Sequence, residues 1–431
     1  MITIQKLKEN INNGSLDNKL SLLYSKSSDD LLYYKNRINN LINNFKKYYN
    51  INDDNLNVYL FSSPGRTEIC GNHTDHQRGK VLTASVNCDM ISLVSLNNNK
   101  TINIYSEEFG LSTIEINNYN KKTEEEHTSL SLIRGILKKI SSLGYKFSGF
   151  NAYISSDVLS GSGLSSSASF EMLVAVILNT LFCNNEISPK DLAIIGQYAE
   201  NIYFNKPSGL MDQMGCMIGG IIKIDFHEKN NPIFEKIKFD FNKNNFVMCI
   251  INSGSNHANL TNHYSSIPLE MESIAKAFKK EVLSEVSEED FYKNINSLRV
   301  ACGDRAILRA IHYYDDNKKV DEEASSLEKR DFNTFLKLIK ESGESSFMHL
   351  QNVSSYDDPR EQSVAIALAL TKKILNGKGS VRVHGGGFAG TIQAFMPLEI
   401  SKKFKKGIEK YLGPNSCHIM NIRDMGAVEV I

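Results

Sequence analysis

The stretch DVLSGSGLSSSASFE (Asp157–Glu171) decides the fold prediction, because a loop of glycine and serine here joins an expected strand to an expected helix. Before it, Phe150–Ile154 alternates apolar and polar residues as a half-buried strand does. Gly161 and Gly163 permit backbone angles that other residues rarely adopt, and the serines that follow can cap a helix. A helix start presents free N–H groups and a partial positive charge, which suits a phosphate. The same small residues would also suit a simple strand–turn–helix joint, so both interpretations stay open at this point.

The composition limits the possible classes of function. A chain of 431 residues predicts two domains that share a cleft, and we place them at residues 1–241 and 242–431. Lys+Arg and Asp+Glu are both 49, so the charge balance supports neither nucleic-acid nor membrane-surface binding. Seven scattered cysteines without a C-x-x-C pair are typical of reduced thiols in the cytoplasm. We expect no membrane span and infer no protein partner.

A second informative stretch is SSPGRTEICGNHTDHQRGKVL (Ser62–Leu82). It concentrates functional side chains within a few residues, namely Arg66, Glu68, Asn72, His73, Asp75 and His76. A solvated surface loop is one interpretation, and a metal site at the two histidines and the aspartate is another, although this spacing matches no familiar site. We favour a sugar-binding loop, because hydroxyl groups require closely placed carboxylate, imidazole and amide partners.

Two further stretches carry candidate chemistry. In KPSGLMDQMGCMIGG (Lys206–Gly220), Asp212 stands among methionines and glycines. A carboxylate in apolar surroundings must be paired or functional, with helix capping as the alternative. In GSVRVHGGGFAGTIQAF (Gly379–Phe395), three successive glycines precede an expected strand, and a glycine triplet alone often marks only a tight turn.

Taken in their order along the chain, these stretches resemble the motifs of the small-molecule kinases that include galactokinase, homoserine kinase, mevalonate kinase and phosphomevalonate kinase. GLSSSAS (Gly163–Ser169) resembles the phosphate loop of the galactokinase branch, and no Walker or protein-kinase signature occurs. GRTEICGNHTDHQRG (Gly65–Gly79) resembles the branch's signature GRVNLIGEHTDYNGG, with Glu68 where asparagine is usual and Asn72 where glutamate is usual. SGLMDQ (Ser208–Gln213) and the glycine triplet resemble further motifs, whereas Leu159 replaces the usual proline.

The resemblance implies an α+β fold of two domains. The N-terminal domain would be similar to ribosomal protein S5 domain 2 and the C-terminal domain ferredoxin-like, with the active site in the cleft between them. It also implies ATP and Mg²⁺ as cofactors. The implied activity is transfer of the ATP γ-phosphoryl group to the anomeric hydroxyl of galactose, which gives galactose 1-phosphate and ADP.

The resemblance also implies a role for each matching residue. Asp212 would be the catalytic carboxylate and Arg66 its partner beside the transferring phosphate, while Ser167 and Glu200 would hold Mg²⁺. The implied sugar-binding residues are Asn72, His73, Asp75, Gly209 and Tyr264. The implied nucleotide-binding residues are Gly161, Ser162, Gly163, Leu164, Ser165, Ser166, Ser167 and Ala168.

Two alternatives remain on the sequence alone. The first is a sister sugar 1-kinase for an N-acetylhexosamine, a uronic acid or arabinose, which Asn72 in place of glutamate keeps open. The second is a sugar sensor without enzymatic activity on the same fold. The presence of Arg66, Glu200 and Asp212 argues against a sensor, because binding alone does not need all three.

Overall fold

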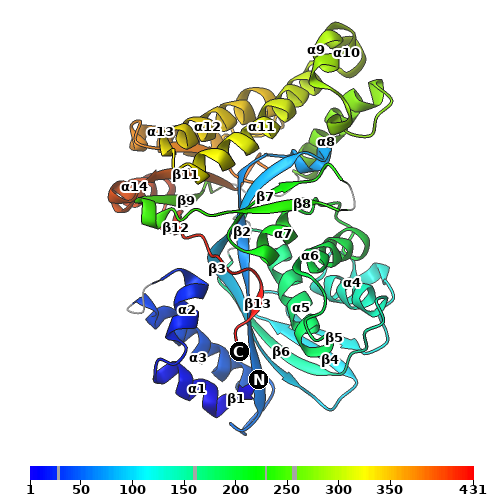
Figure 1. Ribbon diagram of the computed structural model, residues 1–431, viewed down its shortest axis with the longest axis vertical. Helices are drawn as coiled ribbons and strands as arrows, with labels where there is room; N and C mark the ends of the chain where they lie inside the picture. Colours follow the sequence, from blue (N-terminus) through cyan, green and yellow to red (C-terminus); the bar gives the residue numbers. More distant parts are fainter. Residues whose placement is uncertain (27–29, 159–162, 229–230, 255–259) are drawn as a thin grey trace.

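The computed structural model describes residues 1–26, 30–158, 163–228, 231–254 and 260–431. Within these ranges the strands form a nine-stranded and a four-stranded sheet, both flanked by helices (Figure 1). The predicted α+β class is therefore confirmed. The nucleotide-binding predictions for Gly161 and Ser162 lie outside the described residues.

The nine-stranded sheet is built around two long strands, β2 and β3. Its main path runs β1-β2-β3-β6-β4-β5, while β13 pairs with β2, and β7 pairs with β3 and β8. All pairs are antiparallel except β4 with β6. The strands are β1 (Ile2–Thr3), β2 (Asn57–Cys70), β3 (Lys80–Leu96), β4 (Thr101–Ser106), β5 (Gly110–Glu115), β6 (Phe150–Ser156), β7 (Ile221–Asp225), β8 (Ile233–Ile237) and β13 (Val428–Glu429).

Helices cover both faces of this sheet, so its central strands are buried on both sides (Figure 1). Side chains alternate between faces along a strand. Ile91 and Leu93 of β3 therefore pack with the N-terminal helices, while Met90 and Val94 join the core on the opposite face. The N-terminal helices are α1 (Ile4–Asn12), α2 (Asp17–Tyr24) and α3 (Leu32–Tyr48). The opposite face carries α4 (Ser129–Ser141), α5 (Ser166–Phe182), α6 (Pro189–Tyr198) and α7 (Met211–Ile218).

The four-stranded sheet follows the order β10-β11-β9-β12 and is antiparallel throughout. Its strands are β9 (Phe246–Asn252), β10 (Ser380–Val383), β11 (Thr391–Pro397) and β12 (Cys417–Met420). The helices of this half are α8 (Thr261–Ala277), α9 (Glu288–Lys293), α10 (Ile295–Cys302), α11 (Asp304–Glu328), α12 (Phe332–Ser345), α13 (Ser363–Leu375) and α14 (Leu398–Leu412).

The predicted domain division at residue 242 falls between β8 and β9, which belong to different sheets. Three features connect the halves. The C-terminal strand β13 returns to pair with β2, and Met248 and Phe395 of the second sheet join the core of the first. Helix α11 also packs against β2 and β3. This packing brings residues from the second half beside the loop after β2, where the candidate site lies.

Candidate active site

Arg66 and Asp212 form the centre of the candidate site. Arg66 lies on β2, and its Nε and Nη2 lie 2.7 and 2.6 Å from Asp212 Oδ1, in the first turn of α7. The Ser165 hydroxyl donates a hydrogen bond to the other carboxylate oxygen, Oδ2, at 2.5 Å. Burial alone would raise the pKa of Asp212, but the guanidinium and this hydroxyl outweigh burial and lower it. Asp212 is therefore a carboxylate at neutral pH.

The described end of the glycine–serine loop lies against the same arginine. Arg66 donates hydrogen bonds from its backbone N–H to the carbonyl of Leu164, at 3.0 Å, and from Nη1 to the carbonyl of Gly163. Gly163 has φ +71°, and a Cβ there would lie 2.9 Å from Nδ1 of His384, so glycine is required for this approach. His384 is itself buried between Thr67 and Thr391.

Helix α5 begins at Ser166, with the predicted nucleotide-binding residues Ser166, Ser167 and Ala168 in its first turn. The sequence suggested that the serines cap this helix. Ser165 does occupy the N-cap position, but it has φ +57° and makes no side-chain capping bond. Its hydroxyl donates a hydrogen bond to Asp212. The start of the helix thus keeps its backbone N–H groups free of a side-chain cap at Ser165, as an anion-binding helix start requires.

The predicted metal ligands Ser167 and Glu200 also meet. Glu200 lies in a π-helical turn, Ala199–Tyr203, and Ser167 Oγ is 3.3 Å from its Oε1. Lys206 Nζ lies 2.7 Å from the same oxygen, while Ser208 and Gln213 donate hydrogen bonds to Oε2 at 2.6 and 2.8 Å. A carboxylate beside a hydroxyl is a suitable pair of oxygen donors for Mg²⁺. Among the described residues, no group of three or more His, Cys, Asp or Glu is arranged to hold a metal ion.

The predicted sugar loop, Ser62–Leu82, is partly strand, because β2 extends to Cys70 and β3 begins at Lys80. The loop proper, residues 71–79, approaches the second half of the chain. His73 has φ +62°, and its Nε2 is 3.1 Å from the carbonyl oxygen of Gly386. Tyr264, on α8, donates a hydrogen bond from its hydroxyl to the carbonyl of Gly387 at 3.0 Å. A Cβ on Gly209 would lie 2.0 Å from Asp75 Oδ2, so this glycine allows the two segments to meet. The structure therefore gathers His73, Asp75, Gly209 and Tyr264 with the glycine triplet.

Asn72 lies in this loop but is fully buried. Its Nδ2 donates to Glu68 Oε1 at 2.9 Å and to the Gly385 carbonyl at 2.7 Å, and its Oδ1 accepts from Asn352 at 2.7 Å. Both protons of its amide are thus already used within the protein. A direct sugar contact by Asn72, as the resemblance implies, would require some of these bonds to break.

Several residues of the site were not found from the sequence. Asp316 of α11 accepts hydrogen bonds from the backbone N–H groups of Gly71 and Asn72, at 3.2 and 3.0 Å. Arg382 of β10 donates to Glu68, and Asn352 follows the π-helical turn Ser346–Leu350. These residues stand outside any motif, and no local pattern marks them. They become recognisable only when α11 and the second sheet pack onto the loop.

The burial of His73 gives a testable pH effect. Burial lowers its pKa to about 3, so the folded protein keeps this imidazole neutral, whereas the unfolded chain protonates it near pH 6.5. The unfolded state therefore binds more protons below pH 6.5, and stability is lost as the pH falls. Between pH 7 and pH 5.5, the unfolding free energy of the His73→Gln variant should fall by about 1 kcal/mol less than that of the parent protein.

Urea unfolding at both pH values measures this difference. The matched control is His227→Gln, which alters an exposed histidine and should unfold with the pH dependence of the parent. Parallel pH curves for His73→Gln and the parent protein would contradict a neutral, buried His73.

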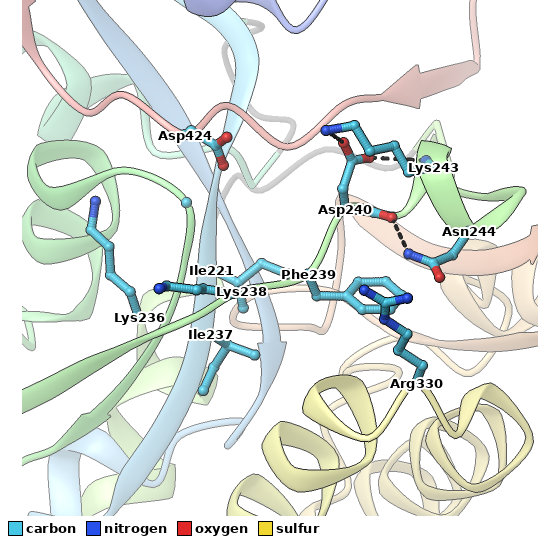
Figure 2. A pocket seen from close by; sticks show the side chains of 11 residues that line it. Ile221, Lys236, Ile237, Lys238, Phe239, Asp240, Lys243, Asn244, Arg330 and Asp424 are labelled. Atoms are coloured by element: carbon cyan, nitrogen blue, oxygen red, sulfur yellow. Dashed lines mark hydrogen bonds and ion pairs between the residues drawn. The ribbon is translucent and has the colours of Figure 1, made fainter.

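A hollow of about 560 Å³ lies elsewhere in the molecule (Figure 2). Strand β8 and the segment that follows it line much of this hollow, together with Arg330 and Asp424, and it shares no residue with the site around Asp212. Basic side chains dominate its charged lining, and Lys236 there already donates to the carbonyl of Ile218 at 2.9 Å. The geometry at Asp212, and not this hollow, brings together groups suited to phosphoryl transfer. Across the described ranges, no helix is long and apolar enough to cross a membrane.

Comparison with known proteins gives the same assignment from two parts of the chain. Residues 131–220 match the model of the GHMP kinases N terminal domain, and residues 43–96 match the galactokinase galactose-binding signature. The chain is 29% identical over 383 residues to a galactokinase of Clostridium tetani, covering 88% of this chain and 93% of that one. It is 27% identical over 361 residues to a galactokinase of Limosilactobacillus reuteri, covering 81% and 89%.

Solved structures show the same fold. A crystal structure of Lactococcus lactis galactokinase complexed with galactose superimposes with a TM-score of 0.76 at 24% identity, covering 90% of this chain and 99% of that one. A mevalonate kinase superimposes with a TM-score of 0.57 at 18% identity, covering 85% and 99%. With the motifs in family order and Arg66 on Asp212, the chain is similar to the galactokinases and matches the N-terminal domain of the GHMP kinases.

Proposed function

We propose that this protein is an ATP-dependent sugar kinase that phosphorylates galactose at its anomeric hydroxyl and releases galactose 1-phosphate and ADP. One observation carries the proposal: the Asp212 carboxylate is held by Arg66 and Ser165 at the end of the glycine–serine loop. A general base, a cation and an anion-binding helix start are thus adjacent. The match to the galactose-binding signature and the similarity to galactokinases support galactose as the substrate.

Each group has a role in the transfer. The anomeric oxygen forms a bond to the γ-phosphorus, the bond from that phosphorus to the bridging oxygen breaks, and ADP leaves. Asp212 accepts the proton of the sugar hydroxyl, because Arg66 keeps it ionised. Arg66 also offsets the negative charge that develops on the transferring group, and the start of α5 binds the phosphates.

His73, Asp75, the backbone at Gly209 and Tyr264 are proposed to hold the sugar. Ser167 and Glu200 are proposed to hold Mg²⁺, which supplies charge neutralisation at the phosphates when it is bound. Phosphoryl transfer depends mainly on positioning and charge, and this set of residues provides both.

Lys206 gives a test of the proposed metal site. Its side chain is half exposed, yet its ammonium lies 2.7 Å from Glu200 Oε1, the oxygen that also faces Ser167. A divalent cation bound there must displace this ammonium. We therefore expect Lys206→Met to bind Mn²⁺ about fivefold more tightly than the parent, as loss of a partly exposed ion pair of about 1 kcal/mol implies.

Electron paramagnetic resonance of free Mn²⁺, in the absence of nucleotide, measures this affinity without relying on activity. Lys206→Arg keeps the positive charge and serves as the control, with an expected affinity close to that of the parent. If Lys206→Met binds Mn²⁺ no more tightly than Lys206→Arg, the ammonium does not compete at this site.

A panel of sugars with coupled ADP detection tests the proposed activity. We expect galactose to give the highest kcat/KM. Strong preference for an N-acetylhexosamine, a uronic acid or arabinose would favour the sister kinase instead. Saturable binding of galactose and ATP without ADP release would favour the sensor.

We also propose a cytoplasmic location. All seven cysteines are free thiols in the structure, and five of them are buried. Unpaired thiols are typical of a reducing compartment. Fusion to a fluorescent protein and microscopy would test this location, and a signal at the cell envelope would contradict it.

A further inference from the structure

Glu68 and Asn72 exchange two residue types of the galactokinase signature. The usual signature, GRVNLIGEHTDYNGG, has asparagine at the first position and glutamate at the second, whereas this chain has GRTEICGNHTD. The chain thus keeps one carboxylate and one amide, but in reversed places. If positions 68 and 72 had changed independently, this reversal of a carboxylate and an amide would be a coincidence.

The structure shows that the two exchanged side chains touch. Asn72 Nδ2 donates to Glu68 Oε1 at 2.9 Å, and both residues are buried. An amide donor and a carboxylate acceptor can form this bond from either position. The exchange therefore keeps a buried hydrogen bond between an amide and a carboxylate, which two carboxylates at these positions could not form.

The two side chains differ in what remains available to a ligand. Both amide protons of Asn72 are used, by Glu68 and by the Gly385 carbonyl, and its Oδ1 accepts from Asn352. It therefore joins the sugar loop to the glycine triplet, which lies between β10 and β11.

Glu68 keeps an available oxygen. Its Oε1 accepts from Asn72 and from Arg382, the latter at 2.8 Å, and within the described ranges no donor reaches Oε2. The side chain belongs to β2, two positions from Arg66, and residues two apart point to the same face of a strand. Glu68 and Arg66 therefore share the face of β2 that carries the candidate site. Burial raises the pKa of Glu68, and the charges of Arg382 and Arg66 oppose this effect.

We propose that Glu68, through Oε2, accepts a hydrogen bond from a galactose hydroxyl remote from the reacting anomeric one, while Asn72 acts as a positioning residue. This inference rests on the proposed function and assigns the sugar-binding carboxylate to position 68 of this chain in place of position 72.

Glu68→Gln is the main test, because the amide keeps the size of the side chain and an oxygen for Asn72 and Arg382. It replaces the acceptor that faces the sugar by a donor. Loss of one hydrogen bond to a charged acceptor should lower kcat/KM for galactose 10- to 100-fold, mostly through KM. One deoxygalactose, lacking the hydroxyl that Glu68 binds, should react equally well with parent and variant.

Glu323→Gln is the matched control. Glu323 is also a fully buried carboxyl that interacts with Arg382, but it lies on α11 and has no place in the proposed site. We expect this variant to keep the parent's kcat/KM for galactose. A thermal melt of each variant verifies that it is folded.

The exchange itself is tested by Asn72→Glu, Glu68→Asn and the double variant. Each single change should lower kcat/KM for galactose at least 10-fold, because Asn72→Glu places two carboxylates against each other and Glu68→Asn removes the carboxylate proposed to bind the sugar. The double variant should recover only part of this loss, because it restores the hydrogen bond between the two side chains but removes the bond to the Gly385 carbonyl and the ion pair with Arg382.

Calorimetric titration with galactose and the deoxygalactoses separates this inference from the proposed function. If galactose binds but no sugar is phosphorylated, the proposed activity fails, and the loss of affinity in Glu68→Gln still tests the contact. The inference is overturned if Glu68→Gln weakens every sugar by the same factor, or if the double variant is no better than the single ones.

Discussion

Asp212→Asn should lower kcat about 1000-fold while it leaves the affinity for ATP nearly unchanged. The amide cannot accept the proton of the sugar hydroxyl, and it also leaves the buried Arg66 guanidinium without its carboxylate. ATP is proposed to bind at the start of α5, so its affinity depends little on this carboxyl. Single-turnover kinetics with galactose and calorimetric ATP titration measure the two effects separately.

The matched control is Asp225→Asn, at the end of β7, which removes a carboxylate outside the site. Its kcat should stay within twofold of the parent's. A kcat for Asp212→Asn within tenfold of the parent's would exclude Asp212 as the base. Equal loss of ATP affinity and turnover would instead indicate that the carboxylate organises the phosphate loop.

The motifs predicted which side chains meet at the centre of this site, because each motif indicates both a local backbone conformation and the charge of a side chain. Arg66 and Asp212 are 146 residues apart, yet their pairing follows from the resemblance, and the structure confirms it. Ser167 and Glu200 also lie in contact, as the resemblance implies. The general fold class also followed, because strand and helix periodicities are local properties of the sequence.

The remaining site geometry depends on packing that no local pattern encodes. Ser165 looks like a capping residue, but its backbone is left-handed, with φ +57°, and its hydroxyl donates to Asp212 without accepting from the helix start. Asn72 looks like a ligand-binding group until its partners from the second half of the chain are known. Local sequence reasoning therefore finds the residue types, whereas tertiary contacts decide which atoms remain available.

Asp316→Ala should lower the unfolding free energy by about 3–5 kcal/mol and raise the KM for galactose more than it lowers kcat. Asp316 is fully buried on α11 and accepts the backbone N–H groups of Gly71 and Asn72. Each bond to a charged acceptor contributes about 1.5–3 kcal/mol, and alanine leaves both donors buried without a partner. The loop that carries His73 and Asp75 then loses its attachment to the second half of the chain.

Urea unfolding and steady-state kinetics measure the two consequences. Asp315→Ala, one residue earlier on the same helix, removes a partly exposed carboxylate that makes neither bond, and should change stability by less than about 1 kcal/mol. Asp316→Asn keeps an acceptor oxygen and should fall between the two alanine variants. If Asp316→Ala loses stability but keeps the parent's KM, then α11 supports the fold without positioning the sugar loop. A raised KM with kcat retained would show that a helix outside every motif sets the geometry in which the sugar is bound.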